Sequence, residues 1–124
     1  MHKLGISMKR DMDLIRQMLL AIEAEPSGWA PDKLEIPNYT QEQINYHAVL
    51  LGEAGLAIVG DISTGENPAA MVSRLTWAGH EFLDASRENQ IWNQAKDAIA
   101  KIGGASIPIW TALLTEIIKK KLNL

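Results

Sequence analysis

Residues 40–59 read TQEQINYHAVLLGEAGLAIV and hold, in order, the start of a helix, its end and the beginning of a strand. Thr40 and Gln43 have the spacing of a capping box, in which each side chain satisfies an amide that the first helical turn leaves without a partner. Gly55 is placed to end the helix, because glycine adopts the left-handed conformation of a helix C-terminus without strain. One face of this helix is marked by residues at helical spacing: Ile44, His47, Ala48 and Leu51.

Two strand-like runs follow this helix, at residues 56–62 and 71–77. Between them lies the polar, turn-rich segment STGENP at residues 63–68. The two runs therefore predict a β-hairpin. A further short edge strand is predicted at residues 34–36, Leu-Glu-Ile, between two prolines.

Four more helices are predicted from apolar residues at helical spacing and from the Pro and Gly residues that flank them. They cover residues 8–25, 77–86, 91–102 and 108–122, the last with Pro in its first turn. The predicted order is α-β-α-β-β-α-α-α, an α+β chain that is mostly helical. Residues 1–7 precede the run MKRDMDLIRQ, which itself looks like a protein start, so we expect them to be a disordered extension.

The composition excludes several classes of protein. A chain of 124 residues has the length of one domain, and we expect residues 1–124 to form one. The absence of Cys excludes a disulfide framework, a thiolate nucleophile and a Cys-based zinc site. The longest apolar run, residues 54–60, is far shorter than the ~20 residues that span a bilayer. No secretory signal pattern is present, so we expect a cytoplasmic protein.

The central part of the chain resembles winged-helix regulators. INYHAVLLGEAGLAIV, at residues 44–59, is similar to their third helix and first wing strand, where a run of the form HLxxLxxAGL turns at the Gly. RLTWAGHEFLDA, at residues 74–85, resembles the second wing strand and the helix after it, with the pattern LTxxGxxFL. The resemblance implies an α-β-α-β-β winged-helix core at residues 8–89, followed at residues 90–124 by an extension of two to three helices.

A narrower resemblance covers nearly the whole chain from Met8. Three segments resemble a family of small bacterial and prophage proteins classed as a domain of unknown function: MKRDMDLIRQMLLAIE (8–23), YHAVLLGEAGL (46–56) and LTWAGHEFLDASRENQIWNQAK (75–96). That resemblance implies a winged-helix fold and no established activity, so it identifies no site residue. The chain departs from ordinary winged helices between Ile36 and Thr40, where there is no room for the usual separate second helix. The helix-turn-helix is therefore expected to be degenerate.

The charge distribution argues against the DNA binding that is usual for winged helices. Affinity for DNA depends on Lys and Arg side chains that neutralise phosphates. Residues 34–73 contain no Lys or Arg and five carboxylates, a formal charge of −5. Nucleic acid is thus a disfavoured partner. The polar residues in this stretch that could form an interaction surface are Gln41, Gln43, Asn45, Tyr46, Thr64 and Asn67.

The basic residues lie elsewhere. If the two ends of the chain fold close together, they form a basic patch that could contact a DNA backbone or an acidic protein. The alternative for the C-terminal residues is that cations in a last helical turn offset the helix dipole. The residues concerned are Lys3, Lys9 and Arg10, then Lys33, and finally Lys119, Lys120 and Lys121.

Three other candidate sites have simpler explanations. His80 and Asp84 are four residues apart on a helix, but a metal ion needs three or four protein ligands, so we expect a solvated helix face. His47 is favoured as a hydrogen-bonded core histidine, with a pH-responsive role as the alternative. Residues 60–65 lack the Lys-Ser/Thr of a phosphate loop and predict a turn. No pattern indicates a catalytic residue, a cofactor or a metal.

Large apolar side chains raise the question of interaction surfaces. Trp77, Trp92 and Trp110 lie on or near predicted apolar stripes, so we expect them in the core or in helix–helix contacts. Trp29 lies in a Pro/Gly-rich loop, where it either covers the core, the more common case, or anchors a partner. We expect the last helix to close the core, with a homodimer through this helix as the alternative and a membrane contact disfavoured.

These observations favour a non-enzymatic winged-helix protein, associated with phage or prophage, that acts through contacts with another protein. The alternative is a DNA-binding transcriptional regulator, which superfamily habit alone supports. A small hydrolase or transferase has no motif behind it.

Overall fold

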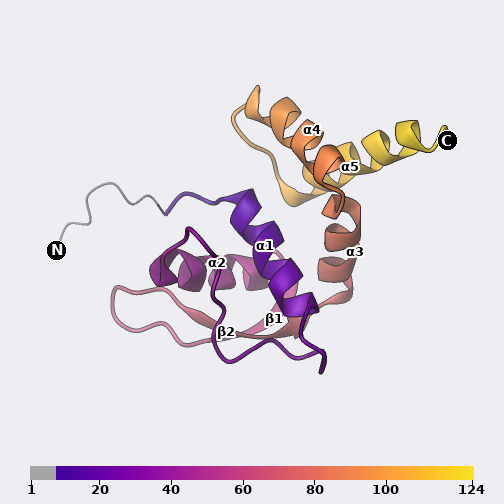
Figure 1. Cartoon of the computed structure of the whole chain (residues 1–124). Coiled ribbons are helices and arrows are strands. Elements are labelled where there is room, and N and C mark those ends of the chain that lie inside the picture. The colour runs from indigo at the N-terminus through magenta and orange to yellow at the C-terminus, as the bar shows by residue number, and fades with distance from the viewer. Residues whose placement is uncertain (1–7) are drawn as a thin grey trace. The chain divides into compact units, whose positions relative to one another are not determined.

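The computed structural model describes residues 8–124 (Figure 1). Within them the chain is α+β and mostly helical, and it forms two compact units that divide between Thr76 and Trp77. The prediction of one domain, with a boundary near residue 90, stays a prediction, and the extension predicted at residues 1–7 lies outside the described residues. The elements are α1 (Met12–Glu23), α2 (Gln41–Glu53), β1 (Ala57–Asp61), β2 (Ala70–Leu75), α3 (Trp77–Ser86), α4 (Asn89–Ala100) and α5 (Ile107–Lys121).

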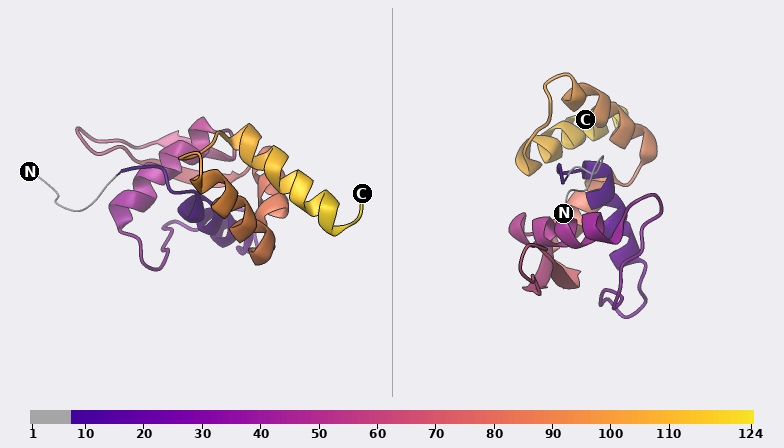
Figure 2. Two further views of the ribbon diagram at one scale, coloured as in Figure 1. Left: turned by 90° about the horizontal axis from the view of Figure 1, so that it is seen from above. Right: turned by 90° about the vertical axis from the view of Figure 1, so that its left-hand side faces the viewer.

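The first unit contains α1, α2 and the hairpin of β1 and β2. Helix α2 packs on both strands, and α1 contacts α2 and β2 (Figure 2). The apolar face of α1 is fully buried, as its helical spacing predicts. The buried apolar side chains of this unit come from all four elements, from the loop after α1 and from the turn between α2 and β1: Leu14, Ile15, Met18, Leu19, Ile22, Leu34, Ile36, Ile44, Ala48, Leu51, Leu56, Ala57, Val72 and Leu75.

Helix α1 is shorter than predicted at both ends. Its start is set by Asp11, whose backbone is extended and whose carboxylate accepts hydrogen bonds from the amides of Asp13, at 2.9 Å, and Leu14, at 3.2 Å. Residues 8–10 therefore lie before the helix. At the other end, Ala24 is the C-cap, and turns replace the last predicted residues.

The predicted start and end of α2 are confirmed. The Thr40 amide donates to Gln43 Oε1 at 2.9 Å, and the Gln43 amide donates to Thr40 Oγ1 at 3.1 Å, which completes the capping box. Gly55 has a φ of 73°, and its amide donates to the carbonyl of Gly52. The Leu56 amide donates to the carbonyl of Leu51, which makes this helix end a Schellman motif.

The hairpin is confirmed, with strands slightly shorter than predicted. Strands β1 and β2 pair antiparallel, with Gly60 opposite Met71 and an irregularity between Ile58 and Val59. Gly52 permits α2 to lie this close to the hairpin, because a Cβ atom at Gly52 would collide with Cγ2 of Val59.

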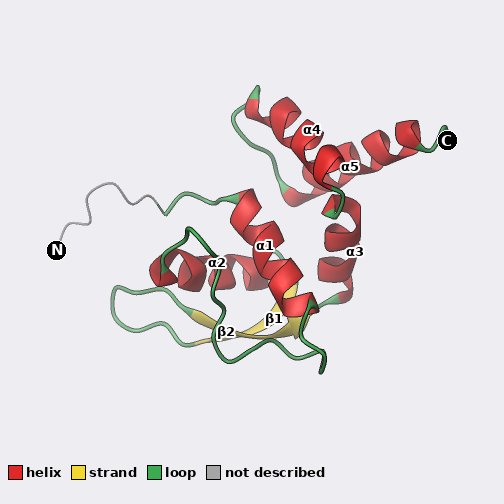
Figure 3. Cartoon of the chain, in the orientation of Figure 1, coloured by secondary structure: helices red, strands yellow, loops and turns green. Residues whose placement is uncertain are grey.

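The edge strand predicted at residues 34–36 is wrong. The whole segment between α1 and α2 is loop (Figure 3), although Leu34 and Ile36 are buried. The segment makes a backbone hydrogen bond to β2 earlier, where the Ala30 amide donates to the Ser73 carbonyl at 2.8 Å. Pro31, which follows, has no amide with which to continue the ladder. The alternation of apolar and polar residues at 34–36 therefore reflects the burial of Leu34 and Ile36 and not the pairing of a strand.

The second unit consists of α3, α4 and α5, and its core is aromatic. Trp92 stacks on Trp110 with ring centroids 4.7 Å apart, and it meets Phe82 edge-on at 6.3 Å. The expectation that Trp92 and Trp110 lie in the core is confirmed, whereas the same expectation for Trp77 is wrong, since Trp77 is 80% exposed. Trp77 is the first residue of α3, and the buried face of that helix is carried by Gly79, Phe82, Leu83 and Ser86.

Helix ends in the second unit follow local rules. Glu88 is the N-cap of α4 and accepts a hydrogen bond from the Ile91 amide at 2.8 Å. Pro108 lies in the first turn of α5, as predicted, and the three lysines occupy its last turn. Helix α5 buries Trp110 and Leu114 and contacts both other helices, so it closes the core of this unit.

Candidate functional site

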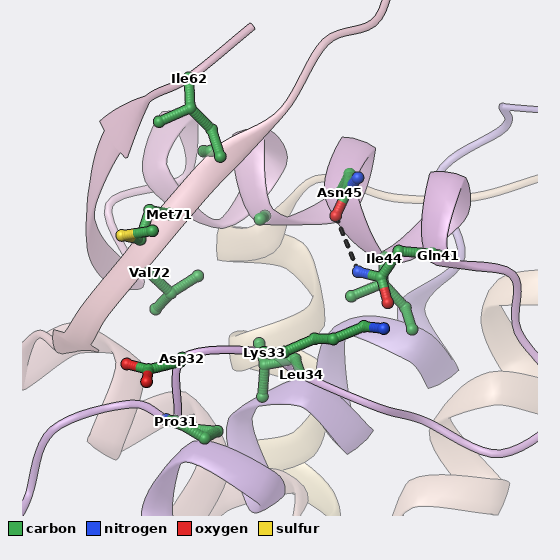
Figure 4. Close-up of a pocket in the computed structure, with 12 residues that line it drawn as sticks. Pro31, Asp32, Lys33, Leu34, Gln41, Ile44, Asn45, Ile62, Met71 and Val72 are labelled. Atoms are coloured by element: carbon green, nitrogen blue, oxygen red, sulfur yellow. Dashed lines mark hydrogen bonds between the residues drawn. The ribbon is translucent and has the colours of Figure 1, made fainter.

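A groove opens in the first unit beside β2. It has a volume of about 340 Å³ and lies between β2, the loop before α2 and the N-terminal half of α2. Figure 4 shows Ile62 and Met71 on the hairpin, with Gln41 and Asn45 across from them on α2. The lining is mostly apolar: Pro31, Asp32, Lys33, Leu34, Gln41, Ile44, Asn45, Ala48, Ile62, Ala70, Met71 and Val72.

Two pairs of residues on α2, each four positions apart, line the groove. Ile44 and Ala48 form one pair and are buried. Gln41 and Asn45 are one turn apart, and Gln41 Nε2 donates to Asn45 Oδ1 at 2.8 Å, which is the dashed line in Figure 4. Two of the polar residues predicted as an interaction surface therefore lie together in the groove lining.

The other two polar residues predicted on α2 have structural roles. Gln43 is engaged in the capping box. Tyr46 is partly buried and contacts the ring of His47 edge-on, with centroids 5.9 Å apart. The four residues thus do not form one continuous polar surface.

Thr64 and Asn67 lie at the tip of the hairpin. Each donates its backbone amide to the other's carbonyl, at 3.1 Å from Thr64 and 2.8 Å from Asn67, and both residues are exposed. The predicted turn at residues 60–65 is also confirmed in part, because β1 continues to Asp61 and the chain turns after it. Ser63 stabilises this turn: its amide donates to Asp61 Oδ1 at 2.8 Å, and its hydroxyl donates to the carbonyl of Ala69.

The carboxylates near the groove are exposed. The hydroxyl and the amide of Ser63 hold the pKa of Asp61 below its ordinary value. Lys33 Nζ lies 3.9 Å from Glu35 Oε1, and both side chains are largely exposed. Glu66, at the hairpin tip, is exposed as well. The surface around the groove is therefore acidic, apart from one lysine whose charge is offset by its neighbour.

A partly buried polar cluster around His47 joins the start of α1 to α2. His47 is 2% exposed, its Nδ1–H donates to the Gln43 carbonyl at 2.8 Å, and its Nε2 accepts from the Asp11 amide at 2.9 Å. The Tyr39 hydroxyl donates to Asp11 Oδ2 at 2.9 Å. The prediction of a hydrogen-bonded core histidine is confirmed, and the cluster ties the start of α1 to α2.

Burial shifts the titration of two groups in this cluster. Burial lowers the pKa of His47, against smaller opposing effects of the Gln43 carbonyl and the Asp11 charge. Burial also raises the pKa of Tyr39 to about 12, with help from its hydrogen bond to Asp11 and from the negative charge there. Both side chains are consequently neutral at pH 7.

The basic residues of the two ends belong to different units. Lys9 and Arg10 are exposed and precede α1. On α5, Lys119 Nζ lies 3.9 Å from Glu116, and Lys121 Nζ lies 3.7 Å from Glu88. Lys120 lines a second hollow beside α4, and Lys3 lies outside the described residues. The joint patch of the two ends stays a prediction.

The remaining candidate residues are dispersed. Asp84 accepts a hydrogen bond from Arg87 at 2.9 Å, and among residues 8–124 no group of three His, Asp or Glu is arranged to hold a metal ion.

Trp29 is 60% exposed, so the expectation that it covers the core is wrong. No helix in the described part of the chain combines the length and the apolar character needed to cross a bilayer.

Sequence reasoning missed the apolar wall of the groove. Ile62 and Met71, which line the groove, are 51% and 55% exposed, and Ile58 on β1, outside the lining, is 44% exposed. The sequence contained an indication of this exposed apolar surface. Along the hairpin, these three residues occupy the solvent-facing positions, where a half-buried hairpin normally carries polar side chains.

Comparison with known proteins places the chain in a family. The model of the family described as "Hypothetical protein (DUF2513)" matches residues 9–106, most of the chain. The chain belongs to the DUF2513 family. An uncharacterised protein of Haemophilus influenzae is 37% identical to this DUF2513 protein over 95 residues, which are 74% of this chain and 79% of that protein. No solved structure matches. The resemblance to a family of unknown function is thereby confirmed, and α5 lies beyond the matched residues.

Proposed function

We propose that this DUF2513 protein is a cytoplasmic winged-helix protein without catalytic activity, associated with phage or prophage, that acts by binding another protein. The contact is made by the acidic face, defined here as the exposed surface of α2, the hairpin and the loop before α2 (residues 34–73). The phage association rests on the sequence resemblance alone, and the genes that neighbour this one test it.

The order of elements supports the winged-helix assignment. Helix α1, helix α2 and the β1–β2 hairpin follow one another as the first helix, the third helix and the wing do in that fold. Helix α2 ends in a Schellman motif and leads at once into β1, and it packs on both strands. The loop between α1 and α2 contains no helix, in agreement with a degenerate helix-turn-helix.

The distribution of charge is the observation that carries the proposed partner. Residues 34–73 hold five carboxylates and no Lys or Arg, and they supply α2, β1, the hairpin loop and most of β2. Proteins that bind duplex DNA neutralise several phosphates with cations, which the acidic face lacks. Acidic surfaces instead complement basic proteins, for which they increase association rates and disfavour wrong partners.

The experiment captures the partner from cells that encode the protein and compares two charge-reversed variants. Glu35→Lys combined with Glu66→Lys changes two exposed residues of the acidic face, and we expect it to abolish capture. The control, Glu81→Lys combined with Asp97→Lys, makes the same change in charge at exposed positions of α3 and α4 and should retain capture.

Fluorescence anisotropy with pools of duplex DNA tests the competing function. We expect no saturable binding at about 150 mM salt. Tight binding that weakens by several log units per log unit of salt, and that is lost when Lys9, Arg10 and the three C-terminal lysines are neutralised, would establish a DNA-binding regulator instead.

A further inference from the structure

We propose that the groove beside β2 binds an extended segment of a basic protein, which adds to β2 as a third strand. This inference rests on the proposed function and specifies its site and the form of the partner. It depends on three properties of the groove: an incomplete sheet edge, an apolar lining and the charge around it.

The edge of β2 away from β1 is only partly used. In the described part of the chain the sheet has two strands, so no strand pairs with this edge. Ala30 donates one hydrogen bond to Ser73, and Pro31 then prevents the loop from continuing as a strand. Beyond that point the loop forms the opposite wall of the groove, and Ala70–Val72, which pair with β1 on their other edge, line the groove. An exposed edge of this kind is a template for an added strand.

The lining suits the side chains of an extended segment. Ile44, Ala48 and Val72 are buried and form apolar surface in the groove, while Ile62 and Met71 are half-exposed at its margin. In a strand, alternate side chains point to the same face, so one in two side chains of an added strand would contact this apolar surface. Gln41 and Asn45 offer amide groups on the α2 side.

The surrounding charge favours a basic segment. Lys33 is the cation among the described residues that line the groove, and Glu35 lies 3.9 Å from its ammonium group. Asp32 is in the lining, and Asp61 lies at the end of β1, next to Ile62. A segment with Lys or Arg beside its apolar residues would be attracted by Asp32 in the lining and by Asp61 next to the lining residue Ile62, whereas an acidic segment or a nucleic acid would be repelled.

The experiment selects from a library of random ten-residue peptides displayed on a surface, with the full chain as the target. We expect the enriched peptides to alternate apolar residues with Lys or Arg. Binding of such a peptide should slow hydrogen exchange at the amides of Ala70–Val72 that face the groove, because main-chain hydrogen bonds form there.

Two matched variants locate the binding. Met71→Lys places a cation in the lining and should weaken peptide binding by about tenfold or more, since it repels the basic segment. Ile58→Lys makes the same change at a similarly exposed residue of β1 outside the lining and should alter binding by less than about twofold. Circular dichroism verifies that both variants remain folded.

The inference is overturned if no peptide is enriched, if the enriched peptides are acidic, or if the two variants weaken binding equally. Failure here is distinguishable from failure of the proposed function. Partner capture that depends on Glu35 and Glu66 but survives Met71→Lys would support the acidic face as the contact surface and refute the groove.

Discussion

Replacement of His47 by Leu tests the partly buried cluster that joins α1 to α2. Leu retains an apolar side chain of similar size but removes both ring nitrogens. The Asp11 amide, which donates to Nε2 at 2.9 Å, then has no acceptor in a partly buried position. A buried donor left without its partner costs about 1–3 kcal/mol, and we expect a loss of that size in the free energy of unfolding at pH 8.

The pH dependence of the loss is the sharper part of this prediction. Burial lowers the pKa of His47 in the folded protein below its ordinary value of 6.5, so the unfolded chain binds the proton more readily. The stabilisation from neutral His47 is therefore complete above about pH 6.5 and is lost as the pH falls below it, by at most ~1.4 kcal/mol per pH unit for one proton. Protonation would also replace the lone pair at Nε2 with a second donor facing the Asp11 amide.

Urea unfolding, followed by tryptophan fluorescence between pH 8 and pH 5, measures both effects. The difference in unfolding free energy between the wild type and His47→Leu should shrink as the pH falls. Tyr39→Phe is the control, because it removes the hydrogen bond to Asp11 and leaves His47 in place, so the wild-type pH dependence near pH 6 should persist. A difference that does not change with pH, or a His47 pKa of 6.5 or above by NMR titration, would refute the reasoning.

Three further substitutions test the packing and the helix ends by chemical denaturation. Gly52→Ala would stabilise an ordinary helix interior by up to about 1 kcal/mol, but here the new Cβ meets Val59, so we expect a loss of stability, and a gain would show that the hairpin can move away. Thr40→Ala should cost about 1 kcal/mol through the lost capping box, and an unchanged midpoint would contradict the observed start of α2. Phe82→Ala should cost about 3–5 kcal/mol, because it removes a 2%-exposed ring from the edge of Trp92; a cost below about 1 kcal/mol would mean that the ring is not in a packed core.

Local interactions explain which elements could be predicted from the sequence. The capping box at Thr40 and Gln43 and the helix end at Gly55 each depend on residues within a few positions of one another, so their sequence pattern is nearly sufficient. The start of α1 depends on Asp11, and the same kind of signal was available there. The prediction began the helix at Met8 instead, because apolar periodicity does not mark a boundary.

The exposed apolar residues of the hairpin could be recognised in the sequence, but the groove as a whole could not be predicted, because it depends on residues that are distant in the sequence. Gln41 and Asn45 were identified as surface residues, but Met71 comes to line the same groove only after the hairpin packs on α2. The strand expected at residues 34–36 fails for a related reason. A strand requires a partner edge as well as alternation, and the chain reaches that edge only at Ala30.

The burial of individual tryptophans likewise depends on tertiary packing and not on the local sequence. Trp77, Trp92 and Trp110 all lie on or near apolar stripes in the sequence, yet Trp92 and Trp110 stack together and Trp77 is 80% exposed. Periodicity places a residue on a helix face, whereas burial depends on which other element covers that part of the face.

The sequence alone was sufficient for the order of the helices and the hairpin, the two ends of α2, and the acidic character of residues 34–73, since these depend on neighbouring residues and on counting charges. Only the tertiary structure established the groove beside β2, the hydrogen bonds of His47 to Asp11 and Gln43, and the exposure of Trp77. The physical reason is that a groove, a buried hydrogen bond between helices and a covered side chain each require two segments to meet in space, and the packing of the whole unit decides which segments do.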